Sequence, residues 1–385
     1  MRNLLILLVL TIACTVPKPE KTSTMTIEKK PDAVYVGSYT RKEGHVDGKS
    51  DGILLMSKDE EGRLRSEKIV DEVINPSYLT TARDGQFLLA VSEIGPDDGV
   101  SGEIKAYKVN KDQSLTLMNT QPTDGFYPCH VSADKEGQFA FVANYVGGTV
   151  KMFAIEPWGS IKSKDVQKLA GSGPHARQEA PHLHMTRLSP DEQYLFVPDL
   201  GTDRIWNFKV DRENAKLVAN ESQPYLELAP GSGPRHLDFH PGGQRAFIIN
   251  ELNSTITVLD YDSMAGSFTV GESTLTIPEG FDEFNGTADI HVHPNGKFIY
   301  GSNRGHDSIV IMSFDQETGT LTQIGLEGTR GGFPRNFSLD AAGQYLYVAN
   351  QNSDNIVQFK IDQSTGMLAF VEEVVDVMTP VCIDM

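Results

Sequence analysis

The chain has 385 residues, and its 34 Lys and Arg against 52 Asp and Glu give a formal net charge of −18 at pH 7. A protein this acidic repels nucleic acid and anionic membrane surfaces, so neither is expected as a partner. An anionic substrate is still compatible with this charge, because a small anion responds to the arginines nearest to it.

The first 14 residues have the pattern of an export signal. Arg2 precedes an apolar run over residues 4–12, which is too short to span a bilayer but suits the core of a secretory signal. The ending LTIAC resembles a bacterial lipoprotein signal, although Thr11 stands where such signals usually have Leu. We therefore expect a signal peptide over residues 1–14 that ends in a lipidated Cys14. Residues 15–32 are polar and Pro-rich and are expected to form a flexible tether.

The leader predicts a location in the cell envelope, either lipid-anchored through Cys14 or periplasmic. The alternative is an unprocessed leader on a cytoplasmic protein. The other two cysteines, Cys129 and Cys382, form neither a disulfide framework nor a zinc-binding spacing. We expect both to be structural.

A repeat of about 50 residues runs through the rest of the chain. Each unit has an opening Pro, a strand, a Gly-centred turn, a second strand and an Asn or Asp, as in GPRHLDFHPGGQRAFIINE. The period and the alternation of apolar and polar residues are typical of propeller blades with four short strands each. No helix is indicated beyond short turns. The opening residues of the units are Pro76, Pro128, Pro181, Pro234, Gly286, Pro334 and Pro380.

The two ends of the chain together complete one further blade. The last unit, TPVCIDM, stops after one strand, whereas AVYVGSYT at residues 33–40 matches a second strand and GILLMSKDEEGRLRSEKIV supplies the third and fourth. A shared blade removes the free sheet edges of an open ring. The sequence therefore predicts one all-β domain over residues 33–385. It is a seven-bladed β-propeller with four-stranded antiparallel blades, closed by strands from both termini, and we expect a monomer.

This topology predicts a crowded face. The first strand of a blade lies innermost and the second is antiparallel to it, so residues after the repeat Pro and residues at the Asn position meet around the central opening. Strand starts bring His130, His182, His184, Arg235, His236, Arg335 and Asn336 to this face, and strand ends bring Tyr39, Glu93, Asn144, Tyr145, Asp199, Asn250, Glu251, Asn303, Arg304 and Gln351. A purely structural ring has no need of so many imidazole and guanidinium groups, so we expect the active site here.

Several motifs along the chain, in order, carry a family resemblance. They are GPHARQEAPHLH, LFVPDLGTDRI, GPRHLDFHPGG, INELNSTITV, SNRGHDSIV and GGFPRNFSLD. Over residues 33–385 the sequence resembles the β-propeller lactonases, which include bacterial 6-phosphogluconolactonases and fungal 3-carboxy-cis,cis-muconate lactonizing enzymes. The resemblance implies a seven-bladed fold without a metal ion or an organic cofactor. Carried over by motif, it also implies site residues at His182, Arg235, Glu251 and Arg304, together with Arg177 and His236.

The residue types at these positions suit the opening of a lactone by water. The reaction needs a base for the water and a positive group facing the carbonyl oxygen as it becomes an oxyanion. Glu251 or His182 is expected to be the base or acid, and Arg235 and Arg304 are expected to hold a carboxylate or phosphate or to stabilise the oxyanion. A covalent nucleophile is not expected, because the chain offers no plausible Ser/His/Asp order. Substrate-binding roles are predicted for Arg177, His184, His236, Arg335, Asn336 and Tyr145.

The leading hypothesis is a hydrolase for a sugar lactone that uses metal-independent general acid/base catalysis. Its substrate would be a small-molecule lactone or an anionic sugar acid. Two alternatives remain open at this point: a muconate-type cycloisomerase, and a non-catalytic binding propeller on the cell envelope. A structural explanation also exists for single residues, since Glu251 and Arg304 could form an ion pair across adjacent blades.

Overall fold

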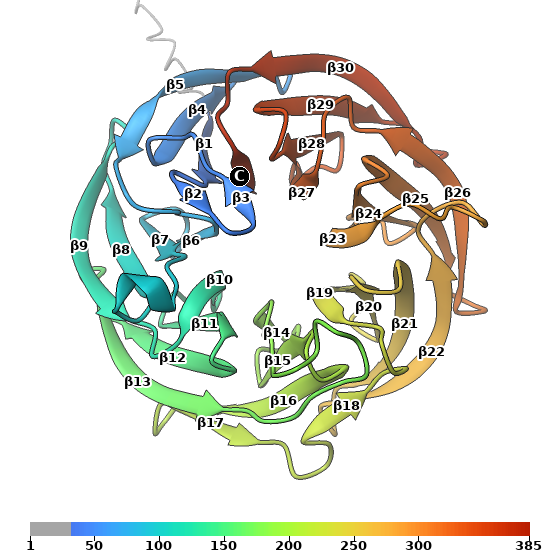
Figure 1. Ribbon diagram of the computed structural model, residues 1–385, viewed down its shortest axis with the longest axis horizontal. Coiled ribbons are helices and arrows are strands. Elements are labelled where there is room, and N and C mark those ends of the chain that lie inside the picture. Colours follow the sequence, from blue (N-terminus) through green and yellow to red (C-terminus); the bar gives the residue numbers. More distant parts are fainter. Residues whose placement is uncertain (1–31) are drawn as a thin grey trace, which may run out of the picture. The chain divides into compact units, whose positions relative to one another are not determined.

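The computed structural model describes residues 32–385, which form seven four-stranded antiparallel sheets arranged around one axis (Figure 1). The predicted signal peptide with Cys14, and the tether up to residue 31, lie outside the described residues. Blade 1 consists of β6 (Leu79–Ala82), β7 (Phe87–Ser92), β8 (Glu103–Val109) and β9 (Leu115–Pro122). Blade 2 consists of β10 (Phe126–Ala133), β11 (Phe139–Val146), β12 (Thr149–Ile155) and β13 (Ile161–Lys168). Blade 3 consists of β14 (Arg187–Leu188), β15 (Tyr194–Asp199), β16 (Arg204–Asp211) and β17 (Lys216–Ala219), and β18 (Tyr225–Glu227) also pairs with β16.

The remaining four blades follow the same plan. Blade 4 consists of β19 (Pro234–Phe239), β20 (Arg245–Asn250), β21 (Thr255–Asp262) and β22 (Ser267–Leu275), and blade 5 of β23 (Gly286–Val292), β24 (Phe298–Arg304), β25 (Ser308–Asp315) and β26 (Thr320–Gly328). Blade 6 consists of β27 (Pro334–Leu339), β28 (Tyr345–Asn350), β29 (Asn355–Ile361) and β30 (Leu368–Val375). Blade 7 consists of β31 (Pro380–Asp384), β1 (Asp32–Ser38), β4 (Ile53–Lys58) and β5 (Leu64–Asp71). A small hairpin of β2 (Lys42–Glu43) and β3 (Val46–Asp47) and a short 3₁₀ turn, η1 (Pro96–Asp98), lie outside the blades. The seven-bladed, all-β prediction is confirmed.

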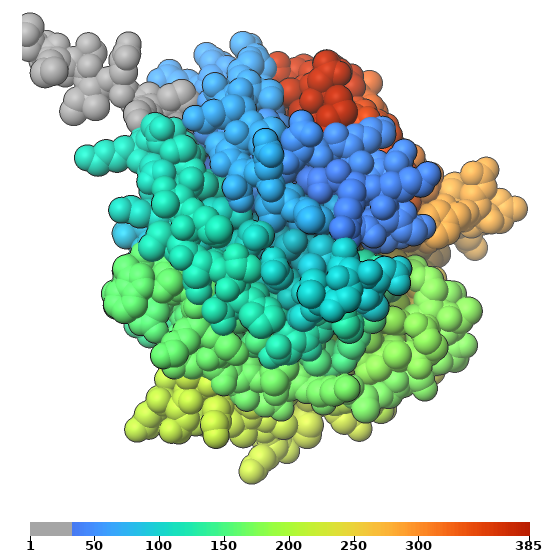
Figure 2. Space-filling view, turned by 60° about the vertical axis from the view of Figure 1, so that its left-hand side comes forward, coloured from blue at the N-terminus to red at the C-terminus, as the bar shows by residue number. Residues whose placement is uncertain are grey.

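Blade 7 closes the ring as predicted. The C-terminal strand β31 pairs antiparallel with β1, with Val36 opposite Ile383 and Gly37 opposite Cys382. Figures 1 and 2 show the blue N-terminal and red C-terminal parts side by side at this junction. β1 is therefore not left as a free edge, and β31 becomes the inner strand of blade 7.

The repeat register differs from the predicted alignment in blade 5. There Thr287 rather than Gly286 pairs with Asn303, as Pro234 pairs with Asn250 in blade 4. The inner strands of blades 2, 4, 5 and 6 also have an irregular step just after this position. Such bulges add a residue that a simple count along the sequence does not detect.

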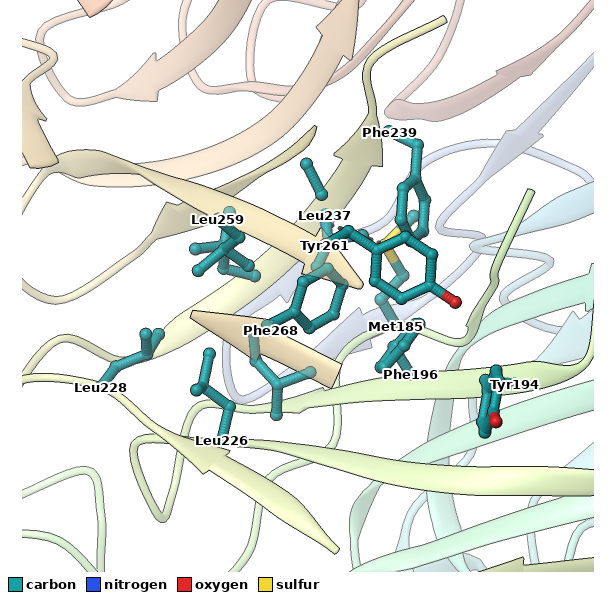
Figure 3. Packing of buried hydrophobic residues seen from close by; sticks show 13 residues of the cluster. Met185, Tyr194, Phe196, Leu226, Leu228, Leu237, Phe239, Leu259, Tyr261 and Phe268 are labelled. Carbon is teal, nitrogen blue, oxygen red and sulfur yellow. Dashed lines mark hydrogen bonds between the residues drawn. The ribbon is translucent and has the colours of Figure 1, made fainter. Parts of the chain in front are cut away.

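Apolar side chains fill the spaces between the blades. Between blades 3 and 4, for example, Met185 and Phe196 pack against Leu237, Phe239 and Phe268, all of them buried (Figure 3). Comparable clusters lie between the other neighbouring blades. With these faces used for packing, the inner strands line the axis of the ring with polar side chains such as His184, His236, Asp289 and Asn336.

Removal of β31 tests the contribution of ring closure. A chain that ends at Thr379 loses the buried Val381, Cys382 and Ile383, and each large buried apolar side chain contributes about 1.5–3 kcal/mol. We expect the melting temperature to fall by about 10 °C or more, with aggregation through the exposed edge of β1. Differential scanning calorimetry and light scattering measure both effects. A chain that lacks only Met385 is the control, and an equal effect in both chains would contradict this account.

Candidate active site

Three guanidinium groups surround the carboxylate of Glu251, the residue directly after β20. Its Oε1 lies 2.7 Å from Arg177 Nη2, and its Oε2 lies 3.1 Å from Arg235 Nε and 2.8 Å from Arg304 Nη2. Burial raises the pKa of Glu251, but Arg304, Arg177 and Arg235 together outweigh it and hold the pKa at about 2. Glu251 is therefore ionised at neutral pH and is a weak proton acceptor.

Strand ends fix two of these arginines. Arg235, the second residue of β19, is 1% exposed, and its Nη1 donates to the carbonyl of Ala288 at 2.5 Å. Arg304 ends β24, and its Nε and Nη2 donate to the carbonyls of Gly286 and Thr287 at 3.0 and 3.1 Å. Burial, with the neighbouring Arg304 and Arg335, lowers the pKa of Arg235 to about 9, so it remains charged at neutral pH.

The loop between β13 and β14 supplies the third arginine. Gln178 is fully buried and anchors this loop, because its Nε2 donates to the carbonyl of Leu200 at 2.8 Å and to Asp203 Oδ1 at 2.7 Å. Its Oε1 accepts the backbone N–H of His175 at 2.9 Å. The neighbouring Arg177 is thereby held so that its guanidinium reaches Glu251 and also Tyr145 Oη, at 3.2 Å.

A cavity of about 450 Å³ adjoins this cluster, a volume in the usual range for small-molecule sites. Its wall combines charged groups with aromatic rings. The residues that line it are Gly44, His45, Glu93, Tyr127, Cys129, Tyr145, Val146, Arg177, His184, Glu251, Phe284, Arg304, Phe333, Arg335 and Gln351.

Arg335 is the cation of this wall that is available to a ligand. Its guanidinium stands 5.4 Å from the centre of the Tyr39 ring, and within residues 32–385 no carboxylate lies within 4.0 Å of it. Burial lowers the pKa of Arg335, but Tyr39 and Glu93 raise it above its usual value, so the group is charged. The other two arginines of the wall are already paired with Glu251.

Of the predicted site residues, Tyr145, Arg177, His184, Glu251, Arg304 and Arg335 share this cavity. His184 is buried, and its Nδ1 has no hydrogen-bond partner in the described part of the chain. Burial lowers the pKa of His184 well below its usual value, and Arg235 and His236 lower it further. The imidazole is therefore neutral at pH 7.

His182 lies beside the cavity and does not line it. Its ring stacks on Tyr145 with a centroid distance of 4.5 Å. Its Nδ1 lies 2.9 Å from the carbonyl of Tyr145, and its Nε2 lies 3.1 Å from Glu179 Oε1. In this blade Leu183, two residues after the repeat Pro181, pairs with Asp199, whereas in blade 4 the repeat Pro234 itself pairs with Asn250. His184, rather than His182, is therefore in ring contact with His236, at a centroid distance of 5.3 Å.

His236 and Asn336 lie deeper along the axis, outside the lining of this cavity. Asp289 joins them: its Oδ1 is 2.8 Å from His236 Nδ1, and its Oδ2 accepts from Asn336 Nδ2 at 2.6 Å. Burial and Arg235 lower the pKa of His236 to about 4 despite Asp289. Arg235 also lies below the cavity and reaches it only through Glu251.

The regular spacing of the blades places the residue after the Asn position, rather than the Asn itself, at the cavity. Asn144, for instance, donates from Nδ2 to the carbonyl of Thr123 at 3.0 Å and so fixes a neighbouring turn. Asn303 donates to the carbonyl of Thr276 at 2.9 Å in the same way. The following residues, Tyr145 and Arg304, line the cavity.

The relatives of the chain agree with this fold. A family model described as "Lactonase, 7-bladed beta-propeller" matches residues 33–385. The chain belongs to the seven-bladed β-propeller lactonase family. A 6-phosphogluconolactonase of Bacillus subtilis (strain 168) is 36% identical over 310 residues, which cover 80% of this chain and 84% of the relative. A 6-phosphogluconolactonase of Formosa agariphila is 37% identical over 315 residues, covering 80% and 86%. The solved periplasmic gluconolactonase of Pseudomonas aeruginosa is 30% identical, has a TM-score of 0.84 and covers 91% of this chain and 98% of its own.

Sequence reasoning missed seven residues that line the cavity, and four of them carry rings. His45 lies on the β2–β3 hairpin, and Tyr127, Phe284 and Phe333 come from residues in or next to the loops that precede the inner strands. These parts fall outside the strongest repeat pattern. The one available signal was the long connection over residues 39–52, where blades 2 to 6 have a short turn.

In the described residues, the surroundings of Cys129, Cys382 and His293 indicate structural roles. Cys129 and Cys382 are free and buried, and burial raises the pKa of both thiols. His293 Nε2 lies 2.8 Å from the carbonyl of Gly343. Among residues 32–385, no group of three or more His, Cys, Asp or Glu side chains is arranged to hold a metal ion.

Glu251→Gln tests the ion cluster. Removing the charge leaves three arginines around a neutral amide, and breaking a buried pair in this way typically costs about 3–5 kcal/mol. The pKa of Glu251 is depressed from 4.5 to about 2. Its contribution is therefore complete above pH 4.5 and is lost as the pH falls through about 2. The unfolding free energies of wild type and variant should differ most at neutral pH and approach each other below pH 4.5.

Glu227→Gln is the control, because it removes an exposed carboxylate, 64% accessible, from an ion pair with Arg204. Such surface pairs contribute about 0–1 kcal/mol. A pH-independent difference between wild type and Glu251→Gln would show that the depressed pKa of Glu251 does not contribute to stability.

Proposed function

We propose that the lactonase hydrolyses a sugar lactone of the aldonolactone class by general acid/base catalysis without a metal ion. The observation that carries the proposal is the cationic wall of the cavity, in which Arg335 has no carboxylate within 4.0 Å among the described residues. Hydrolysis of a lactone forms an oxyanion and then a carboxylate. Guanidinium groups stabilise both species by charge and by paired hydrogen bonds.

The remaining wall of the cavity supports a sugar ring as the substrate. Tyr127, Tyr145, Phe284 and Phe333 offer aromatic surface for the C–H faces of a pyranose, and Gln351 and Glu93 offer hydrogen-bonding groups. The names of the relatives point to the same chemistry: two are called 6-phosphogluconolactonase, and a solved neighbour is called a periplasmic gluconolactonase. The substrates in these names share the lactone ring and differ by one phosphate.

A metal-free mechanism fits the state of the carboxylates in the cavity. Both oxygens of Glu251 are ion-paired with arginines, and Glu93 Oε1 accepts the Tyr39 hydroxyl at 2.9 Å. The cationic charge that would polarise the carbonyl is supplied by arginine. A muconate-type cyclisation is a weaker fit, because its substrate carries several carboxylates and Arg335 is the one guanidinium in the described lining without an anionic partner.

We further propose that the protein acts in the cell envelope. The export-type leader with Cys14 and the periplasmic gluconolactonase among the structural relatives support this location. In the part of the chain that the structure describes, no helix has the length and apolar character needed to cross a membrane. The intact mass of the mature N-terminus distinguishes a lipidated Cys14 from a free or unprocessed leader.

Arg335→Gln tests the anion site. Wild-type protein should consume base above the spontaneous rate in a pH-stat with gluconolactone or 6-phosphogluconolactone. Loss of a charged hydrogen bond costs about 1.5–3 kcal/mol, so kcat/KM should fall about 10- to 100-fold. The loss should be larger for the phosphorylated lactone, because it carries the additional anion.

Arg330→Gln is the matched control. Arg330 lies in the same segment, but its guanidinium is 3.6 Å from Glu327 and its side chain is 49% exposed, outside the cavity lining. It should leave kcat/KM unchanged. Wild-type turnover at the background rate on all aldonolactones would refute the proposed function.

A further inference from the structure

The cavity has a second polar side, opposite in character to the arginine cluster. The connection between β1 and β4, residues 39–52, carries the β2–β3 hairpin, which Figure 1 shows turned toward the central opening. His45 lies at the tip of this hairpin and lines the cavity. Its ring meets Tyr39 edge to face at a centroid distance of 5.4 Å and Tyr127 at 6.1 Å, and 46% of its side chain is exposed.

A buried carboxylate faces this imidazole. Glu93, the residue after β7, is 5% exposed, and its Oε1 lies 3.9 Å from His45 Nε2 while accepting the Tyr39 hydroxyl. Its Oε2 is buried without a hydrogen-bond partner in residues 32–385. A separation of 3.9 Å is longer than a direct hydrogen bond, but catalytic hydrogen bonds are often long before substrate binds and shorten in the complex.

The other candidate bases are less suitable. Glu251 is tied to three arginines and has a pKa of about 2. His182 does not line the cavity, and both of its ring nitrogens face oxygen atoms. His184 is almost fully buried, so a water molecule has little access to it. His45 is accessible to solvent and lines the cavity, and the carboxylate of Glu93 lies near its Nε2.

We infer that His45 is the general base of the proposed lactone hydrolysis and that Glu93 is its positioning residue. This inference rests on the proposed function. The Glu93 carboxylate holds the proton on Nε2, which leaves the lone pair of Nδ1 for water.

The proton balance of the reaction is complete with these groups. Nδ1 accepts a proton from water as the water oxygen bonds to the lactone carbonyl carbon, and the arginine side of the cavity stabilises the oxyanion. When the bond from that carbon to the ring oxygen breaks, the imidazolium returns its proton to the ring oxygen. The new carboxylic acid then releases one proton to solvent.

The charged groups around His45 favour its neutral form at pH 7. Burial lowers the pKa of His45, Glu93 and Glu43 raise it, and Arg335 lowers it, with a net decrease from the usual 6.5. Tyr39 and Tyr127 are the other titratable groups in contact with the ring, and burial raises the pKa of both hydroxyls. A neutral imidazole can accept a proton, so kcat should rise with pH along a single acidic limb.

His45→Gln is the first test, with aldonolactone hydrolysis followed in a pH-stat. A general base typically contributes about 10²- to 10⁴-fold, so kcat should fall at least about 100-fold and the acidic limb should disappear. Free imidazole should restore part of kcat in His45→Gly, which a purely structural role would not produce. His306→Gln is the matched control, because His306 is half-buried beside β24, bonds Ser308 at 2.8 Å and does not line the cavity.

Glu93→Gln is the second test. Loss of the carboxylate removes a charge that raises the pKa of His45, so the acidic limb should shift to lower pH. Thermal melting of each variant reports whether the fold is intact.

The outcomes separate the two proposals. If wild-type protein hydrolyses the lactone and His45→Gln keeps a near-normal kcat or an unchanged acidic limb, the role of His45 is overturned and the proposed function stands. Failure of imidazole to restore His45→Gly overturns the same role. Wild-type protein without lactone turnover overturns the proposed function and the role of His45 with it.

Discussion

The pairing of β31 with β1 is the constraint on which the rest of the structure depends. It joins residues at the two ends of the domain, such as Val36 and Ile383, and so gives every blade two neighbours. Each blade can then bury both faces against the next, as Phe196 and Phe239 do between blades 3 and 4. The apolar side chains that stabilise the fold are buried between the blades. The inner strands can therefore place imidazole, carboxylate and guanidinium groups along the axis without loss of this packing.

The buried charges depend on that rigid frame. Removing Glu251, Arg235 and Arg304 from water costs several kcal/mol for each ion, and the cost is offset only when geometry and hydrogen bonds are good. Here the backbone carbonyls of Gly286, Thr287 and Ala288 accept three further hydrogen bonds from Arg235 and Arg304. The result is a locally cationic cavity in a protein whose net charge is −18. Glu251 is best understood as the group that holds these arginines in place.

The sequence alone was sufficient for the architecture because the repeat is a periodic signal. Apolar alternation, turn glycines and the split terminal unit predicted seven blades and their closure, and the strand ends correctly brought Glu251 and Arg304 into one cluster. The choice between neighbouring residues was harder. In blade 3, Leu183 rather than the repeat Pro181 pairs with Asp199, so of the two predicted histidines only His184 lines the cavity. Charge, burial and pairing at Arg335 also depend on contacts that no local pattern encodes.

The loops explain what the repeat could not predict. His45 and Phe284 belong to segments that interrupt the blade pattern, and no periodicity relates them to the strand ends that they face. The blades fix Arg235 and Arg304 through backbone contacts. The hairpin within residues 39–52 and the segment that carries Phe284 line the solvent side of the cavity, where Phe284 is 64% exposed. A change in such a loop alters the shape of the cavity without disturbing the packing between blades. The positions of Arg235 and Arg304 are therefore a property of the fold, whereas the shape of the cavity on its solvent side is a property of the loops.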